Sequence, residues 1–150
     1  MATEPATPAP LGAASTTAAI AVPASHQHLL KANQSAVLAT VNRDGSPHTS
    51  VVWSMVDDAG LIVIAFSASG HKHRNLTRMP VASLLFVDPS NVHRTLEVRA
   101  AVSLAADDAQ RTMTRAIIAS YGIDPMVYAA SIAEERTVAT LHPTRVRTIG

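Results

Sequence analysis

An apolar run of six residues, Leu61–Phe66, constrains the fold of this chain more than any other segment. Its side chains are apolar on both faces of a strand, so such a strand must be covered on both sides. The turn residues Asp57–Gly60 precede the run, and the polar segment Ser67–Leu76 follows it and is expected to open a short helix. The run therefore predicts a strand that lies centrally in a closed sheet and not at an edge.

Alternating apolar and polar residues, separated by turn signals, predict five more strands. The dipeptide Asp44-Gly45 is typical of a hairpin turn, and Pro80 should end the helix that begins near His71. Six antiparallel strands with helices inserted late favour a mainly β protein, a small Greek-key barrel with α insertions. The expected strands are 36–41, 47–56, 61–66, 81–87, 94–104 and 136–142, the expected helices are 26–33, 71–78 and 106–121, and residues 143–149 are expected to run extended.

Composition limits the number of domains and the kinds of partner. A chain of 150 residues has room for one domain with a substantial core. A formal net charge of +1 creates no field that attracts nucleic acid or an anionic membrane surface, and no apolar run is long enough to span a membrane. The sequence contains no cysteine, which excludes disulfides and permits a reducing compartment. We therefore expect a cytoplasmic protein without nucleic-acid or membrane partners.

The first 24 residues differ from the rest of the chain, because they are mostly Ala, Thr and Pro and contain no Lys or Arg. A signal peptide requires a basic start and an uninterrupted apolar run, and this segment has neither. Its composition is typical of disorder. The predicted organisation is a disordered tail, residues 1–24, followed by one domain, residues 25–150.

The polar segment after the apolar run predicts an anion site. A helix N-terminus carries unpaired N–H groups and a partial positive charge, which favour a phosphate. Lys72, one of two lysines in the chain, adds a full charge, and Ser67 and Ser69 add hydroxyl donors. Two interpretations stay open: a phosphate site, or a capped helix whose polar face is only solvated.

Other candidates are the histidines beside Lys72 and the only tryptophan. His71 and His73 are two positions apart, so on a helix their side chains point about 200° apart, which is poor for chelation, and we expect no metal site. One of them could donate a proton to a bound ligand, or both are simply exposed. Trp53 lies on a strand expected to border the site, where it either shapes a substrate pocket or packs in the core. The loop residue Tyr128 could also reach this pocket.

A series of short motifs then occurs in a characteristic order. The motifs are Ala39–His48, Val52-Trp53, Lys72–Leu76, Pro80, Leu96–Ala100 and Pro143–Gly150. Together they resemble the split β-barrel flavin and deazaflavin oxidoreductases, the pyridoxamine 5′-phosphate oxidase-like superfamily. The last motif is especially similar to the branch that uses the deazaflavin coenzyme F420. The resemblance covers roughly residues 26–150 and implies a six-stranded antiparallel Greek-key split β-barrel of the FMN-binding type.

The resemblance also implies a function. The expected protein is an oxidoreductase that transfers a hydride from reduced F420 to an unsaturated small molecule, and it is a homodimer with its sites at the subunit interface. Two alternatives stay open: an FMN-dependent oxidase or reductase, and a non-catalytic carrier of a flavin or tetrapyrrole. F420 has an acidic tail that favours basic groups at the pocket mouth, for which Arg43, Arg74 and Arg78 are candidates.

Positions in the motifs carry the expected site, although no catalytic residue is assigned. The residues expected at the cofactor phosphate are Lys72, Asn75, Ser67 and Ser69. The residues expected at the ring system, partly through backbone amides, are Ser50, Val51, Val52 and Trp53. Many relatives have an arginine two positions before the lysine, where this chain has Gly70. Without that charged hydrogen bond, worth about 1.5–3 kcal/mol, phosphate affinity falls roughly ten- to a hundredfold unless Arg74 or a histidine substitutes.

Overall fold

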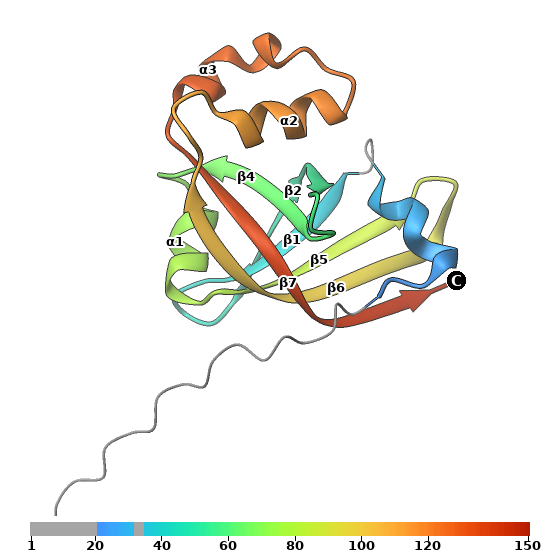
Figure 1. Cartoon of the computed structure of the whole chain (residues 1–150). Coiled ribbons are helices and arrows are strands. Elements are labelled where there is room, and N and C mark those ends of the chain that lie inside the picture. The colour runs from blue at the N-terminus through green and yellow to red at the C-terminus, as the bar shows by residue number, and fades with distance from the viewer. Residues whose placement is uncertain (1–20, 32–34) are drawn as a thin grey trace, which may run out of the picture.

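A computed structural model describes residues 21–31 and 35–150, in which one antiparallel sheet curls around a core (Figure 1). The predicted helix end at Asn33, and the predicted tail up to residue 20, lie outside the described residues. The strands are β1 (Ala36–Val41), β2 (Pro47–Val52), β3 (Ser54–Val56), β4 (Ile62–Ser67), β5 (Val81–Asp88), β6 (Asn91–Ala106) and β7 (Arg136–Ile149). The helices are the 3-10 helix η1 (Ala24–Leu30), α1 (His71–Arg78), α2 (Thr112–Ser120), the 3-10 helix η2 (Pro125–Tyr128) and α3 (Ala129–Ala133).

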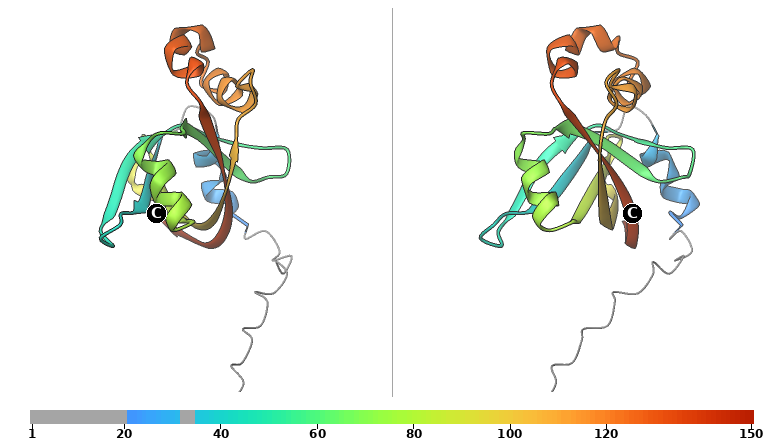
Figure 2. Two further views of the ribbon diagram at one scale, coloured as in Figure 1. Left: turned by 90° about the vertical axis from the view of Figure 1, so that its left-hand side faces the viewer. Right: turned by 60° about the vertical axis from the view of Figure 1, so that its left-hand side comes forward.

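The sheet has seven strands and not the predicted six, because the predicted second strand breaks at Trp53. Before the break, β2 pairs with β1, and after it, β3 pairs with β4. The strand order is β2-β1-β5-β6-β7-β4-β3, so β2 and β3 are the two edges of the sheet. Only Trp53 separates these edges along the chain, so the sheet must curl until they meet (Figure 2). The mainly β split barrel is confirmed, and the strand number was wrong by one.

The last strand also differs from the prediction, since residues 143–149 belong to β7 and do not merely run extended after it. A register shift allows this: Arg99 of β6 pairs with Arg145, the next residue of β6 pairs with Pro143, and Thr144 is left as the extra residue of a bulge. Proline has no N–H to donate to a ladder, and a bulge is a place where a sheet accepts it. β7 therefore continues through Pro143 to the end of the chain.

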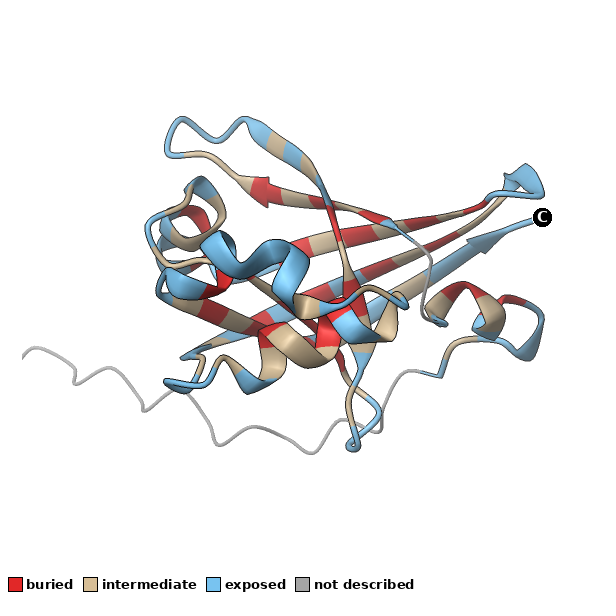
Figure 3. Ribbon diagram, turned by 90° about the horizontal axis from the view of Figure 1, so that it is seen from above, coloured by how far each residue is buried: buried red, intermediate tan, exposed pale blue. Residues whose placement is uncertain are grey.

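Strand β4 holds the apolar run that constrained the fold. It lies between β7 and β3, second from an edge, so the prediction that it is not an edge strand is confirmed and the prediction of a central position is not. Ile64 is fully buried in the core, and Val63, which points to the opposite face, is only 1% exposed. Helix α2 packs against β4, which explains why both faces are apolar. Figure 3 shows how buried positions alternate with less buried ones along the strands.

Helix α1 has the predicted bounds, whereas α2 starts at Thr112 and not at residue 106. The start moves because β6 continues to Ala106 and Arg111 then adopts a left-handed backbone conformation (φ 57°). Asp107 still interacts with the helix start, because its carboxylate accepts hydrogen bonds from the N–H groups of Met113 (3.2 Å) and Thr114 (2.9 Å). Within the described residues no single helix has the length and apolarity to cross a membrane, although α2 and the bent η2–α3 segment together pass that test.

The N-terminal helix η1 binds the far end of the sheet. His26 is buried, and its Nε2 lies 3.1 Å from the carbonyl oxygen of Ile149. His28 Nε2 lies 3.1 Å from a carboxylate oxygen of Asp88 in the β5–β6 turn. Asp88 also accepts hydrogen bonds from the N–H (2.8 Å) and the hydroxyl (2.6 Å) of Ser90. Both ends of the described domain are thus tied to each other and to this turn.

Asp88 gives a pH-dependent prediction. The Ser90 hydroxyl and, next, His28 hold the pKa of the Asp88 carboxyl far below its ordinary value. A carboxyl whose pKa is lower in the folded state contributes stability above its unfolded pKa of about 3.9, and this contribution is lost as the pH falls towards the folded pKa. We expect Asp88→Asn to lower the free energy of unfolding at neutral pH, and the difference from the wild type to shrink in acid. Urea unfolding of both proteins at neutral pH and at a pH below the unfolded pKa of about 3.9 measures this. A difference in the free energy of unfolding that does not change with pH would contradict the prediction.

Candidate functional site

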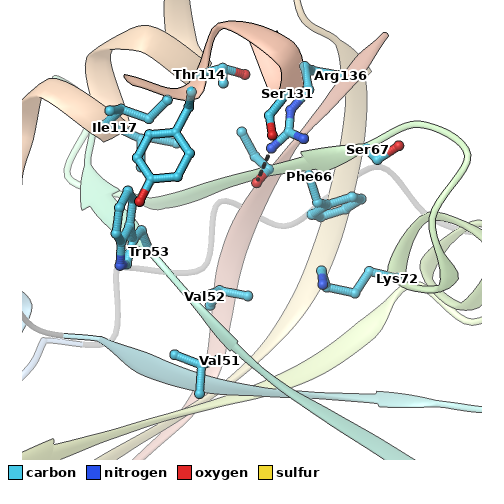
Figure 4. A pocket seen from close by; sticks show the side chains of 13 residues that line it. Val51, Val52, Trp53, Phe66, Ser67, Lys72, Thr114, Ile117, Ser131 and Arg136 are labelled. Carbon is cyan, nitrogen blue, oxygen red and sulfur yellow. Dashed lines mark hydrogen bonds between the residues drawn. The ribbon is translucent and has the colours of Figure 1, made fainter. Parts of the chain in front are cut away.

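A cavity of about 460 Å³ lies between the curled sheet and the helices that cap it (Figure 4). This volume is within the range of small-molecule sites. Its charged lining residues are Lys72 and Arg136, and no described carboxylate lines it. The cavity therefore carries two cations and no anion of its own. The lining residues are Val51, Val52, Trp53, Ala65, Phe66, Ser67, Lys72, Thr114, Ile117, Ile118, Tyr128, Ser131 and Arg136.

Lys72 lies in the first turn of α1 and is half-buried. Burial and, to a lesser degree, the charge of Arg136 lower the pKa of the Lys72 ammonium. Among the described residues, Lys72 takes part in no ion pair. A cation that is desolvated and repelled by a second cation is stabilised by a bound anion. The geometry therefore supports the anion site that the sequence predicted at this lysine.

Only one of the two serines of the predicted phosphate site lines the cavity. Ser67 ends β4 and lines the cavity with Lys72, whereas Ser69 is exposed and lines a different hollow with Glu134 and Glu135. Their hydroxyl oxygens are 3.1 Å apart, so Ser69 reaches the cavity only through Ser67. No side chain caps the first turn of α1, so its N–H groups remain available to an anion.

Three of the four residues predicted at a ring system line the cavity: Val51, Val52 and Trp53. Because β2 is an edge strand, the backbone groups on its free side have no strand partner and are available to a ligand. Val51 is 68% exposed at the mouth of the cavity, while Val52 is buried. Ser50 does not line the cavity, and its buried hydroxyl has no hydrogen-bond partner among the described residues.

Trp53 is held by both tyrosines of the chain. The Tyr121 ring stacks on it with a centroid distance of 4.8 Å, and the Tyr128 ring meets it edge-on at 5.5 Å. The Tyr121 hydroxyl accepts a hydrogen bond from the N–H of Ser54 (3.0 Å), and burial raises the pKa of Tyr121. Of the two interpretations of Trp53, the structure supports the wall of a pocket, because its half-buried ring lines the cavity beside Tyr128.

Asn75, also predicted at the phosphate, does not line this cavity. Its side chain is only 2% exposed and its amide nitrogen donates to Thr40 Oγ1 (3.1 Å) and Asn42 Oδ1 (3.0 Å). Its amide oxygen accepts a hydrogen bond from Arg78 (3.1 Å). These contacts join α1 to β1 and to the turn after it, so the role of Asn75 in this structure is to hold α1 against the sheet.

Sequence reasoning missed Arg136. It is the first residue of β7 and pairs across the sheet with Ser67, which brings it to the cavity from a distant part of the chain. Its Nη2 donates a hydrogen bond to the carbonyl oxygen of Ala65 (3.2 Å), and its buried Nε has no partner among the described residues. The signal that could have found it is the register between β4 and β7, which no local pattern in the sequence reveals.

A second hollow, of about 480 Å³, lies on another face of α1. It contains all three arginines that the sequence suggested for an acidic tail. Arg74 belongs to this hollow, where its Nη1 donates to the carbonyl oxygen of Ser69 (2.7 Å), and it does not line the Lys72 cavity in place of the arginine absent at Gly70. The residues that line the hollow are Asn42, Arg43, Asp44, His71, Arg74, Asn75 and Arg78.

The two histidines beside Lys72 point away from its cavity. His71 Nε2 lies 2.9 Å from Asn42 Oδ1, and its ring lies 4.6 Å from that of His48. His73 Nδ1 lies 2.9 Å from Thr137 Oγ1. Neither histidine lines the cavity, so neither is placed to give a proton to a ligand there.

The fold and the site define a split-barrel protein whose cavity combines two cations with an apolar and aromatic wall. The family model of pyridoxamine 5′-phosphate oxidase matches residues 22–150. The chain therefore belongs to this family of split-barrel flavin-binding proteins. No functionally curated protein sequence matches it.

Solved structures give the same fold. An F420 reductase is 26% identical, with a TM-score of 0.73, and the match covers 84% of this chain and 98% of that one. A conserved hypothetical protein of Mycobacterium tuberculosis is 21% identical, with a TM-score of 0.69, over 90% of this chain and 89% of that one. A heme binding protein of Mycobacterium smegmatis is 20% identical, with a TM-score of 0.64, over 87% of this chain and 56% of that one. The last two similarities concern the fold alone.

Proposed function

We propose that this protein is an oxidoreductase that uses reduced coenzyme F420 to reduce an unsaturated small molecule. One observation carries the proposal: the cavity combines the Lys72 ammonium with an aromatic and aliphatic wall and has no described carboxylate in its lining. A phosphorylated tricyclic cofactor needs these two surfaces, a cation for its phosphate and an apolar slot for its ring. The similarity to an F420 reductase at 26% identity supports this choice of cofactor.

In this proposal the residues of the chain bind, orient and exclude water. Lys72 and Ser67, with the uncapped first turn of α1, bind the phosphate. Val52 and Trp53 pack against the ring, the free backbone groups of β2 fix its orientation, and Ile117 of α2 keeps the site dry. When bound, the reduced deazaflavin supplies a hydride to the unsaturated bond. The proton that completes the two-electron reduction comes ultimately from solvent, since the described lining contains neither a carboxylate nor a histidine to hold it.

FMN is the alternative cofactor, because its phosphate suits Lys72 equally well. The hollow that contains Arg43, Arg74 and Arg78 favours F420, whose acidic tail has charges that these arginines match. A non-catalytic carrier is the third candidate. It is favoured by the lack of an acidic side chain in the described lining, since such a side chain could donate a proton during a reaction. Turnover separates a carrier from both enzymes.

We also propose that the protein is a homodimer, in the cytoplasm, with its two sites at the subunit interface. Exposed apolar side chains lie on and next to the lining of the cavity: Val51, which lines it, is 68% exposed, and Met126 and Val127, which precede the lining residue Tyr128, are 62% and 71% exposed. A second copy that covered them would bury apolar surface and close the mouth. Size-exclusion chromatography with light scattering measures the mass in solution.

The test of the proposed function follows reduced F420 by absorbance in the presence of the protein and a panel of unsaturated compounds. The proposal expects at least one compound to accelerate oxidation of the cofactor over the protein-free control. A protein that binds F420 and leaves it reduced with every compound is a carrier. If the protein accelerates the oxidation of reduced FMN and not that of reduced F420, the flavin alternative is correct.

Trp53→Phe tests the role of the aromatic wall. The smaller ring keeps an apolar surface but no longer fills the space against Tyr121 and Tyr128, so the substrate is positioned less well. We expect kcat/KM to fall by about tenfold and the Kd of the cofactor to change by less than about threefold. Steady-state kinetics and cofactor titration measure both. A loss of thermal stability with unchanged kinetics would assign Trp53 to the core.

A further inference from the structure

The second cation of the cavity, Arg136, has no role in the scheme above. It enters from the start of β7, whereas Lys72 enters from α1. Figure 4 shows Arg136 towards the α3 end of the cavity and Lys72 towards α1, with the two side chains well apart in the view. One site therefore presents two cations to two different regions of any ligand that fills it.

Arg136 forms no ion pair with a described carboxylate. Burial lowers the pKa of the Arg136 guanidinium, the carboxylates of Glu134 and Asp107 oppose this, and Arg111 adds to it. Lys72, which Arg136 repels, adds a second positive neighbour. Because no described carboxylate is within ion-pair distance of the guanidinium, the positive charge of Arg136 itself remains for a ligand.

The guanidinium is also directed away from the phosphate end of the site. Arg136 pairs with Ser67 through the backbone, but its Nη2 reaches back along β4 to the carbonyl oxygen of Ala65 (3.2 Å). This is the one hydrogen bond that the guanidinium makes among the described residues, and its buried Nε has none. A guanidinium has five N–H donors in a planar fork that suits a carboxylate. The Nη donors that Ala65 does not use are therefore the ones left for a ligand in the cavity that Arg136 lines.

We infer that Arg136 binds the acidic group of the substrate, so that the substrate is an unsaturated carboxylic acid with an apolar body. The body would pack against the wall formed by Trp53, Tyr128 and Ile117, and the carboxylate would meet Arg136 beneath α3. The inference rests on the proposed function in calling this ligand a substrate. The anion site at Arg136 does not depend on the cofactor.

The test compares trans-cinnamate with cinnamamide, a neutral ligand of nearly the same shape. Isothermal titration measures both with the protein alone and with oxidised F420 at saturation, which permits no reaction. We expect cinnamate to bind at least about tenfold more tightly than cinnamamide, since a charged hydrogen bond is lost in the amide. Arg136→Gln should remove this preference, Arg136→Lys should keep part of it, and Arg145→Gln, an exposed arginine of the same strand, should keep all of it.

Each outcome decides the inference. Equal binding of the two ligands to the wild type, no binding of either, or a preference that survives in Arg136→Gln overturns it. If Arg136→Gln weakens F420 binding as much as Lys72→Gln and the wild type shows no preference for cinnamate, Arg136 belongs to the cofactor phosphate and the inference is also overturned. If F420 does not bind but the protein alone prefers cinnamate through Arg136, the anion site stands and the proposed function fails. If Arg136→Gln does not fold, the affinities of the wild type and of Arg136→Lys for cinnamate and cinnamamide test the inference instead.

Discussion

Replacing Lys72 by glutamine is expected to weaken cofactor binding by about ten- to a hundredfold while the protein remains folded. The reason is that Lys72 supplies a full charge at the start of α1, and no described carboxylate shares it. Burial and Arg136 already lower the pKa of this ammonium, so removing it relieves repulsion and desolvation in the empty cavity. Fluorescence titration gives the Kd, and thermal unfolding gives the stability.

The matched control is Lys31→Gln, since Lys31 is the only other lysine of the chain and lies exposed at the end of η1. This variant should bind the cofactor as the wild type does. If Lys72→Gln binds the cofactor with wild-type affinity, the phosphate does not lie at Lys72. The same loss in both lysine variants would show that only the overall charge matters.

Replacing Asn75 by alanine is expected to destabilise the protein by about 3 kcal/mol and to lower Tm by about 10 °C. Asn75 is 2% exposed, and the hydroxyl of Thr40, which it satisfies, is buried as well. Removing the amide leaves the partners of a buried network without hydrogen bonds, which costs more than the net value of the bonds themselves. Urea and thermal unfolding measure the loss.

The structure separates this effect from cofactor binding. Because Asn75 does not line the Lys72 cavity, the Kd of the folded Asn75→Ala protein for FMN, which has no acidic tail to reach the arginine hollow that Asn75 lines, should stay within about threefold of the wild type. Thr77→Ala, an exposed change on the same helix, is the control and should leave both stability and Kd unchanged. An Asn75→Ala protein of normal stability and much weaker affinity would place Asn75 at the phosphate, as the sequence suggested.

Much of the fold could be predicted from the sequence because its signals are local. The apolar run in β4 shows that both faces of that strand are covered, and Pro80 marks the end of α1. The hairpin turn at Asp44-Gly45 sets the pairing of β1 with β2. Each of these features depends on residues that are neighbours along the chain.

The remaining features depend on contacts between distant segments. Nothing in the order of residues shows that the chain changes from one sheet edge to the other at Trp53, because the break is defined by the different strands with which the two halves pair. Asn75 faces inward because Thr40 lies beneath it, and that contact joins residues 35 positions apart. Arg136 reaches the cavity only through the pairing of β7 with β4. Local patterns locate Lys72 and Ser67, whereas the register of the sheet supplies the second cation.

The central claim, that the cavity holds a phosphorylated deazaflavin, is tested most directly by titrating the protein in parallel with oxidised F420 and with FMN while recording Trp53 fluorescence. Trp53 is the only tryptophan and forms part of the wall, so quenching reports occupation of this cavity. The proposed function predicts quenching by F420 at micromolar concentration or below, with weaker binding of FMN. Tighter binding of FMN would contradict the choice of F420, and binding of neither would contradict the cofactor site itself.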